Sequence, residues 1–277
     1  MTLPHLTYEK LDHPDLLRVL FHPRPDWSSP PPGAVDQEVE VAPGVALTLR
    51  YFLAEDPALP NILFFHGNGE VAADYDEIGP RYNEAGLNFI VAEYRGYGKS
   101  GGTPTVSAMI SDAHLLLAAV REKLQALGRS GHLLVMGRSL GSVPALELAA
   151  GEAESVGGLI VESSIGHTIP FLLCLGVEVA RYGIVSEADG FKNVQKIALV
   201  SKPTYILHAQ HDAIIPLTSA ETMQMECAAH SKEFQMVPGA DHNNIIDRTG
   251  RLYFQAIKQF SKKVGQPPRR KRPGVRT

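Results

Sequence analysis

Short apolar runs alternate with longer stretches whose apolar residues recur every three or four positions along most of the chain. The short runs are typical of strands and the longer periodic stretches of amphipathic helices. We predict strands at 35–41, 45–53, 62–65, 87–92, 133–136, 159–161, 205–207 and 234–237. We predict helices from residue 71 and at 106–127, 139–149, 169–182, 217–229 and 245–264.

This alternation predicts an α/β fold. The first two strands flank Pro43-Gly44, a turn dipeptide, and so form an N-terminal β-hairpin. The later strands are short, mostly apolar runs, as expected when helices cover both faces of a mostly parallel central sheet. We find no internal repeat.

Three segments depart from this alternation of strands and helices. Residues 1–34 are rich in proline and read as an extended lead-in that cannot sustain a helix. Residues 35–264 form the main domain, and an apolar insertion at about 163–203 reads as a small helical cap whose inner face lines a substrate pocket. Residues 265–277 form a basic, flexible tail.

Charge and cysteine content narrow the class of protein. The net charge of the 277 residues is −4, so no global basic field attracts a polyanion and a nucleic-acid partner is not expected. Only Cys174 and Cys227 are present, which fits a reducing compartment. Neither a leader-like start nor an apolar run long enough for stable membrane insertion is found, so we expect a soluble, cytoplasmic protein of unknown oligomeric state.

The first candidate for chemistry is Ser139, in Gly137-Arg138-Ser139-Leu140-Gly141. This motif joins an apolar strand to a helix, where a serine turns sharply out of the sheet between two small residues. Its hydroxyl then lies at a helix N-terminus, whose amides favour developing negative charge. We predict that Ser139 is a nucleophile.

A serine nucleophile needs a base and an acid that orients the base. His242 follows the strand at 234–237 and Asp212 follows the strand at 205–207, so both belong to the sheet edge that carries Ser139. The order Ser, Asp, His along the chain is the order found where the nucleophilic serine lies on a strand-to-helix turn of this kind. Glu162, which ends another strand, is the alternative acid.

The reaction also needs two backbone amides aimed at the oxyanion. Leu140, directly after the nucleophile, supplies one. We expect Asn68 in His66-Gly67-Asn68-Gly69-Glu70 to supply the other, because Gly67 lets the chain turn toward the site.

Two further patterns, one typical of dinucleotide binding and one of a metal site, lack the surrounding sequence that such sites require. Residues 96–101 fit G-x-G-x-x-G, but no acid closes the next strand as a dinucleotide site requires. A metal site made of His208, His211 and Asp212 lacks a matching partner motif. We therefore predict neither a cofactor nor a metal.

Taken together, HGNGE, EYRGYGKS, GRSLGS, HAQHD with Pro216, and GADHNN resemble the α/β hydrolases over residues 35–264. EYRGYGKS and GRSLGS are similar to small-cap serine hydrolases related to protein depalmitoylases and short-chain esterases. Glu93 stands where those relatives commonly have Asp, which we expect to affect loop packing. The resemblance implies the same roles for Ser139, His242 and Asp212, and for the Asn68 and Leu140 amides. The cysteine-rich N-terminal anchor of the depalmitoylases is not found, so soluble acyl substrates are expected.

The predicted function is hydrolysis of a small acyl ester or thioester through an acyl-enzyme. Two alternatives remain open: a non-catalytic binding protein of the same fold, and a hydrolase of C–N or C–C bonds that shares every motif above.

Overall fold

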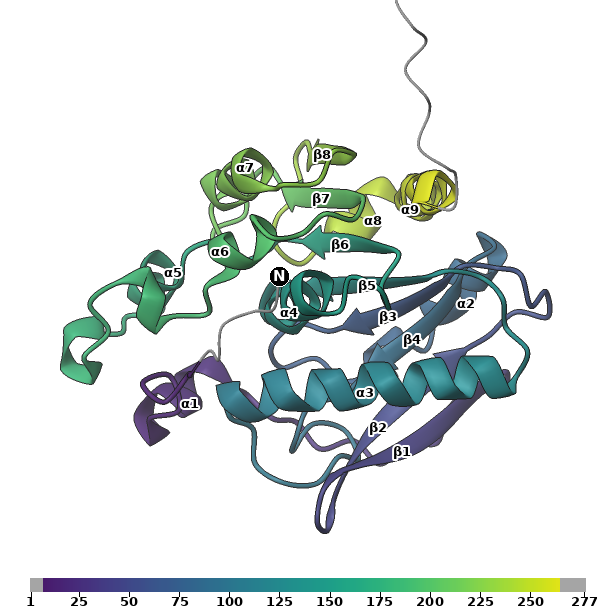
Figure 1. Cartoon of the computed structure of the whole chain (residues 1–277), viewed down its shortest axis with the longest axis horizontal. Coiled ribbons are helices and arrows are strands. Elements are labelled where there is room, and N and C mark those ends of the chain that lie inside the picture. The colour runs from purple at the N-terminus through teal and green to yellow at the C-terminus, as the bar shows by residue number, and fades with distance from the viewer. Residues whose placement is uncertain (1–6, 265–277) are drawn as a thin grey trace, which may run out of the picture.

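The computed structural model of the protein describes residues 7–264 and contains one eight-stranded sheet (Figure 1). The strands are β1 Ala34–Ala42, β2 Val45–Phe52, β3 Asn61–Phe65, β4 Asn88–Ala92, β5 Leu133–Arg138, β6 Gly158–Glu162, β7 Thr204–Ala209 and β8 Lys232–Val237. Their order is β1-β2-β4-β3-β5-β6-β7-β8. Strand β2 runs antiparallel to β1 and β4, and every other neighbouring pair is parallel. This architecture confirms the predicted mostly parallel sheet with an N-terminal hairpin.

Helices cover both faces of the sheet. They are α1 Pro14–Leu20, α2 Gly79–Glu84, α3 Val106–Ala126, α4 Ser142–Gly151, α5 Thr168–Cys174, α6 Asn193–Ile197, α7 Leu217–Glu226, α8 Ile245–Thr249 and α9 Arg251–Val264. Four 3₁₀ turns are η1 Ala72–Tyr75, η2 Ser139–Gly141, η3 Val179–Tyr182 and η4 Glu187–Asp189. Apolar residues of α3, α4, α6 and α7 pack on one face, and those of α2, α8 and α9 on the other. Among residues 7–264, no helix combines the length and apolarity needed to cross a membrane.

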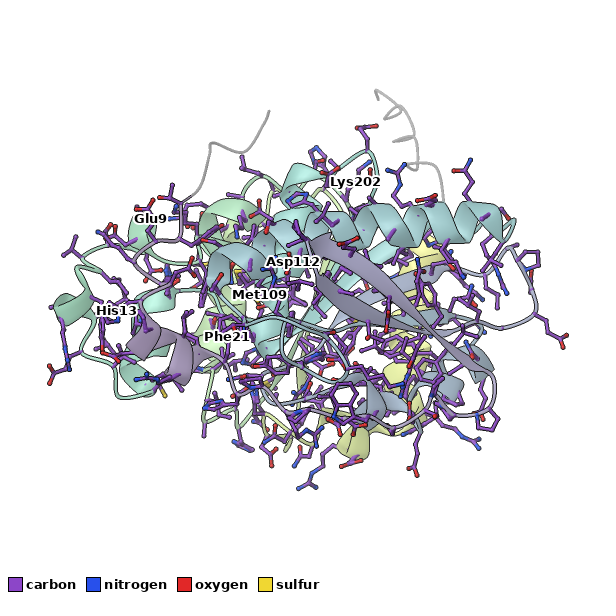
Figure 2. All side chains as sticks on the ribbon, turned by 90° about the horizontal axis from the view of Figure 1, so that it is seen from below. Glu9, His13, Phe21, Met109, Asp112 and Lys202 are labelled. Atoms are coloured by element: carbon purple, nitrogen blue, oxygen red, sulfur yellow. The ribbon has the colours of Figure 1, made fainter. Side chains whose placement is uncertain are left out.

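The predicted extended lead-in is wrong over α1. Pro14 stands in the first turn of this helix, where its missing N–H is not needed, and no proline follows until the helix has ended. Leu16 and Leu20 are buried in the same core cluster as the sheet. Phe21, just after α1, and Met109 of α3 belong to that cluster as well (Figure 2).

Three predicted helices are shorter or broken. The cap helix expected at 169–182 divides into α5 and η3 around Gly176, which has a positive φ of 77°. The last helix divides into α8 and α9 at Gly250, where φ is 54°. In place of the helix predicted from residue 71, the chain forms only η1 and α2 before β4. Within the predicted cap, Leu172 is buried, whereas Leu175 is 38% exposed.

The sheet brings distant loops together. The segments after β3, β5, β7 and β8 all leave the carboxyl ends of parallel strands, so they meet at one edge of the sheet. They carry the loop at 66–70, Ser139, Asp212 and His242, respectively. The segment from α5 to α6 lies beyond the same edge (Figure 1).

Candidate active site

Ser139 lies in a strained turn between β5 and α4. Its φ of 53° is in the left-handed region, which a non-glycine residue adopts only where its surroundings impose it. A Cβ on Gly137 would overlap the carbonyl oxygen of Gly141, and one on Gly141 would overlap that of Phe65. Both glycines are therefore required by close backbone packing, as the sequence predicts.

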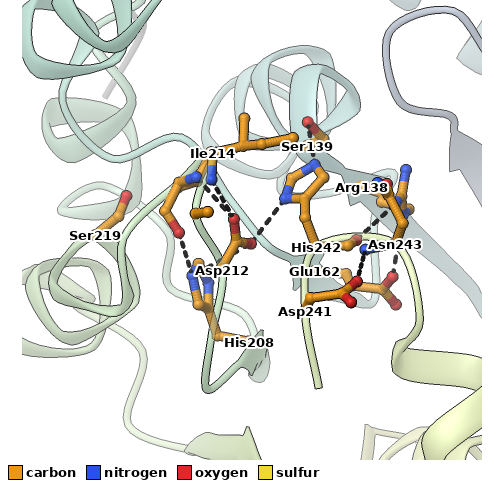
Figure 3. A network of polar contacts seen from close by, with 12 residues as sticks. Arg138, Ser139, Glu162, His208, Asp212, Ile214, Ser219, Asp241, His242 and Asn243 are labelled. Atoms are coloured by element: carbon orange, nitrogen blue, oxygen red, sulfur yellow. Dashed lines mark hydrogen bonds and ion pairs between the residues drawn. The ribbon is translucent and has the colours of Figure 1, made fainter. Parts of the chain in front are cut away.

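The structure brings Ser139, His242 and Asp212 together in one line of hydrogen bonds (Figure 3). Nε2 of His242 lies 3.1 Å from Oγ of Ser139, and Nδ1 of His242 lies 2.7 Å from Oδ2 of Asp212. Because a carboxylate only accepts hydrogen bonds, Nδ1 carries the proton and the lone pair of Nε2 faces the serine. All three residues are buried, each with an exposed fraction of only 7–8%.

Backbone amides also fix the Asp212 carboxylate. Its Oδ1 accepts hydrogen bonds from the N–H of Ile214 at 3.0 Å and of Ile215 at 2.8 Å. Burial alone would raise the pKa of Asp212, but the hydrogen bonds from His242 and from the Ile215 N–H oppose burial, and that pKa is lowered. Asp212 therefore stays ionised beside the imidazole.

Other candidates at this edge have different partners. His208 donates from Nε2 to the carbonyl oxygen of Ile215 at 2.8 Å, and burial lowers the pKa of His208. Glu162, the alternative acid, forms an ion pair with Arg138 at 3.4 Å and accepts a hydrogen bond from Tyr253 at 2.5 Å. The acid that contacts His242 is therefore Asp212.

The loop at 66–70 is held from two directions. The Asn68 side chain accepts hydrogen bonds from the His22 backbone N–H at 2.8 Å and from the Tyr97 hydroxyl at 2.7 Å. Glu93 contacts His66 at 3.1 Å and accepts from the Ala72 N–H at 2.7 Å, so its carboxylate connects this loop to η1. Leu140 lies in the first turn after Ser139, where N–H groups have no intrahelical acceptor.

Polar side chains of the loop at 93–102 contact the hairpin formed by β1 and β2. The Lys99 ammonium lies 3.0 Å from the Asp36 carboxylate, and the Ser100 hydroxyl accepts from the Thr48 N–H at 2.9 Å. The glycines of the dinucleotide-like pattern serve this turn, since Gly96 and Gly98 have positive φ and a Cβ on Gly98 would overlap the Glu93 carboxylate.

The sequence patterns did not predict three residues that shape the site, Arg138, Glu70 and His22. Arg138 occupies the variable position before the nucleophile, and Glu70 ends the HGNGE motif. The sequence offers one signal for the pair of Arg138 and Glu70: they carry opposite charges and follow strands that end at the same edge of the sheet. His22 lies in the proline-rich segment, where nothing in the sequence indicates contact with the loop at 66–70.

Two cavities border these residues. A cavity of about 730 Å³ is lined by Arg138, Glu162 and His242 together with α2, α8 and the turn at 70–78. A second, apolar cavity of about 100 Å³ lies between α5 and the segment 214–222, and its walls include Ile165, Phe171 and Ile215.

Residues 56–170 match the family described as serine aminopeptidase S33. The chain is 27% identical to protein bem46 of Schizosaccharomyces pombe, over 81% of this chain and 76% of that protein. It is 30% identical to the human alpha/beta hydrolase domain-containing protein 17B, over 72% of this chain but only 65% of that protein's length.

Solved structures show the same fold. An esterase of Pyrococcus furiosus matches with a TM-score of 0.69 and 16% identity, covering 88% of this chain and 98% of the esterase. A soluble variant of monoglyceride lipase from Saccharomyces cerevisiae matches with a TM-score of 0.66 and 17% identity, covering 87% and 97%. The chain therefore has the α/β-hydrolase fold, and its sequence is similar to proteins of that superfamily.

Proposed function

We propose that the protein is a serine hydrolase that cleaves acyl esters or thioesters through an acyl-enzyme. The observation that carries the proposal is the placement of His242, within hydrogen-bonding distance of both the Ser139 hydroxyl and the Asp212 carboxylate. This is the arrangement by which a base activates a serine hydroxyl at neutral pH. The esterase and lipase names of the structural neighbours agree with it.

In the proposed reaction Ser139 Oγ attacks the acyl carbonyl carbon while Nε2 of His242 takes the hydroxyl proton. The amides of Asn68 and Leu140 stabilise the tetrahedral oxyanion. As the intermediate collapses, His242 returns the proton to the leaving alcohol or thiol. Water, deprotonated by His242, then attacks the acyl-enzyme and releases the acid, which restores the Ser139 hydroxyl. Asp212 stays ionised and stabilises the imidazolium in both steps.

The small apolar cavity is our candidate site for the acyl chain. It borders the triad because Ile214 and Ile215, which hold Asp212, also line it. Its volume of about 100 Å³ is well below the roughly 300–1,000 Å³ of sites for drug-sized ligands, which favours a short acyl group.

The test is hydrolysis of p-nitrophenyl butyrate by Ser139→Ala, with Ser111→Ala as the matched control. Ser111 is an exposed serine of α3. We expect Ser139→Ala to fold normally and to lose on the order of 10⁶-fold in kcat, while the control keeps wild-type activity. A fluorophosphonate probe should label the wild type and Ser111→Ala but leave Ser139→Ala unlabelled. Wild-type turnover by Ser139→Ala rejects the proposal, and an unlabelled, inactive wild type favours a binding protein.

A further inference from the structure

The guanidinium of Arg138, the residue before Ser139, holds the loop that carries His242. Its Nη2 donates to the carbonyl oxygen of His242 at 2.7 Å and to Oδ1 of Asn243 at 3.0 Å. Asp212 and Arg138 approach His242 from opposite sides (Figure 3). The imidazole is therefore oriented by the carboxylate, and its backbone is fixed by the arginine.

The same guanidinium holds the loop at 66–70. Its Nη1 donates to Oε1 of Glu70, and Oε2 of Glu70 accepts from the Gly67 N–H at 2.6 Å and from the Tyr75 hydroxyl at 2.7 Å. Gly67 directly precedes Asn68, whose amide we propose as an oxyanion donor. The Glu70 carboxylate thus connects the guanidinium to the backbone that aims this amide.

A second carboxylate fixes the plane of the guanidinium. Nε of Arg138 lies 3.4 Å from Oε1 of Glu162, whose other oxygen accepts from Tyr253. Burial alone would raise the pKa of Glu70, but the Arg138 charge outweighs it and lowers that pKa. Burial keeps the pKa of Glu162 above its ordinary value, although Arg138 opposes the effect.

We propose that Arg138 is a positioning residue that holds two loops, the one that carries His242 and the one at 66–70, in place around Ser139. The inference rests on the proposed function. Three edges of one planar group contact three separate segments, which a lysine ammonium, as a single point charge, cannot reproduce. Arg138 touches no reacting atom in this scheme, and its effect on the reaction passes through His242 and Gly67.

The neighbouring cavity provides a way to test this role directly. Arg138, Glu70 and Glu162 all line the cavity of about 730 Å³. Removal of the arginine side chain leaves the two carboxylates facing a space that a guanidinium ion can enter. A free ion that rebuilds the same contacts should restore the positions of both loops.

The experiment measures p-nitrophenyl butyrate hydrolysis by Arg138→Ala with and without millimolar guanidinium, and by Arg138→Lys. Since displacements near 1 Å can cost about 100-fold, we expect Arg138→Ala to lose roughly that factor in kcat with little change in KM. Guanidinium should restore at least about tenfold of this loss, and methylammonium should not. Arg138→Lys should fall between the wild type and Arg138→Ala.

Arg50→Ala is the matched control. Arg50 is also buried and paired with two carboxylates, Asp36 and Asp76, but contacts neither loop of the site. Its loss should lower the unfolding temperature while kcat of the folded protein and its response to guanidinium stay unchanged. A wild-type kcat in Arg138→Ala, or a loss that guanidinium does not reverse in the folded variant, overturns the positioning role.

A readout independent of turnover separates this inference from the proposed function. The proton shared by Nδ1 of His242 and Asp212 is observable by NMR as a downfield resonance. We expect it to broaden or vanish in Arg138→Ala and to return with guanidinium. If the wild type hydrolyses no ester, the proposed function fails while this resonance still decides whether Arg138 positions His242. An unchanged resonance in the variant counts against the inference.

Discussion

Arg138 and Lys196 are both cations inside the protein, yet they join different kinds of structure. Arg138 connects two loops at the sheet edge through Glu70 and the His242 carbonyl. Lys196 of α6 lies 2.9 Å from Glu147 of α4. The Arg138 side chain is 13% exposed beside a large cavity, whereas that of Lys196 is 1% exposed.

The surroundings of Lys196 explain its different role. His114 of α3 and the hydroxyl of Tyr8 also face Glu147, at 3.7 and 3.5 Å. Burial lowers the pKa of Lys196, although the charge of Glu147 opposes the change. All these groups stand on packed helices or on the N-terminal segment, and none contacts the loops around Ser139. The comparison predicts that loss of a buried ion pair enclosed between helices lowers stability, whereas loss of one that joins the loops of the site lowers activity.

The largest expected effect is on stability. Glu147→Gln leaves Lys196 buried without a counter-charge, and removal of one partner of a buried pair costs about 3–5 kcal/mol. We expect urea unfolding to show that loss, with kcat of the folded fraction unchanged. The double variant Glu147→Met/Lys196→Met should lie within about 1 kcal/mol of the wild type, because it removes both charges. If Glu147→Gln lowers the unfolding free energy only slightly, the contrast between the contacts of Lys196 and those of Arg138 fails.

The matching change among the contacts of Arg138 is Glu70→Gln. The glutamine side chain can no longer accept from both Arg138 and the Gly67 N–H, so we expect kcat to fall about 100-fold. Arg138 keeps Glu162 and reaches water in the cavity, so the unfolding free energy should change by only about 1 kcal/mol. Glu233→Gln is the control, since Glu233 forms an exposed ion pair with Lys263. A variant that loses stability but keeps its kcat would contradict the comparison.

Local patterns were sufficient to predict the sheet and the residues that meet at its edge. Most of the parallel strands are short apolar runs; Ser139 directly follows one of them, and Asp212 and His242 lie in the loops after two others. Because parallel strands end at a common edge, their placement follows from the alternation of elements alone. The side-chain geometry that joins them is a property of the folded chain.

Sequence reasoning failed where tertiary contacts or single glycines decide the outcome. Gly176 and Gly250 end helices whose apolar periodicity continues past them. The proline content of the lead-in conceals α1, because Pro14 begins this helix and no further proline occurs before it ends. Arg138 was missed because its partners Glu70 and His242 are 68 and 104 residues away.

The smallest expected effect is the acid sensitivity of the buried cluster of Glu147, Lys196 and His114. Burial alone would raise the pKa of Glu147, but His114 and Lys196 outweigh burial and lower it to about 2. A carboxylate with a lowered folded-state pKa stabilises the protein above its unfolded pKa, near 4.5, and this contribution is lost as the pH falls toward 2. Between about pH 5 and 3.5 we expect the wild type to lose roughly 1 kcal/mol more unfolding free energy than Glu147→Met/Lys196→Met. Other carboxylates titrate equally in both proteins, so urea unfolding across this range isolates the difference. Parallel stability curves would show that Glu147 carries no such linkage and that the helices, not the ion pair, hold this part of the fold together.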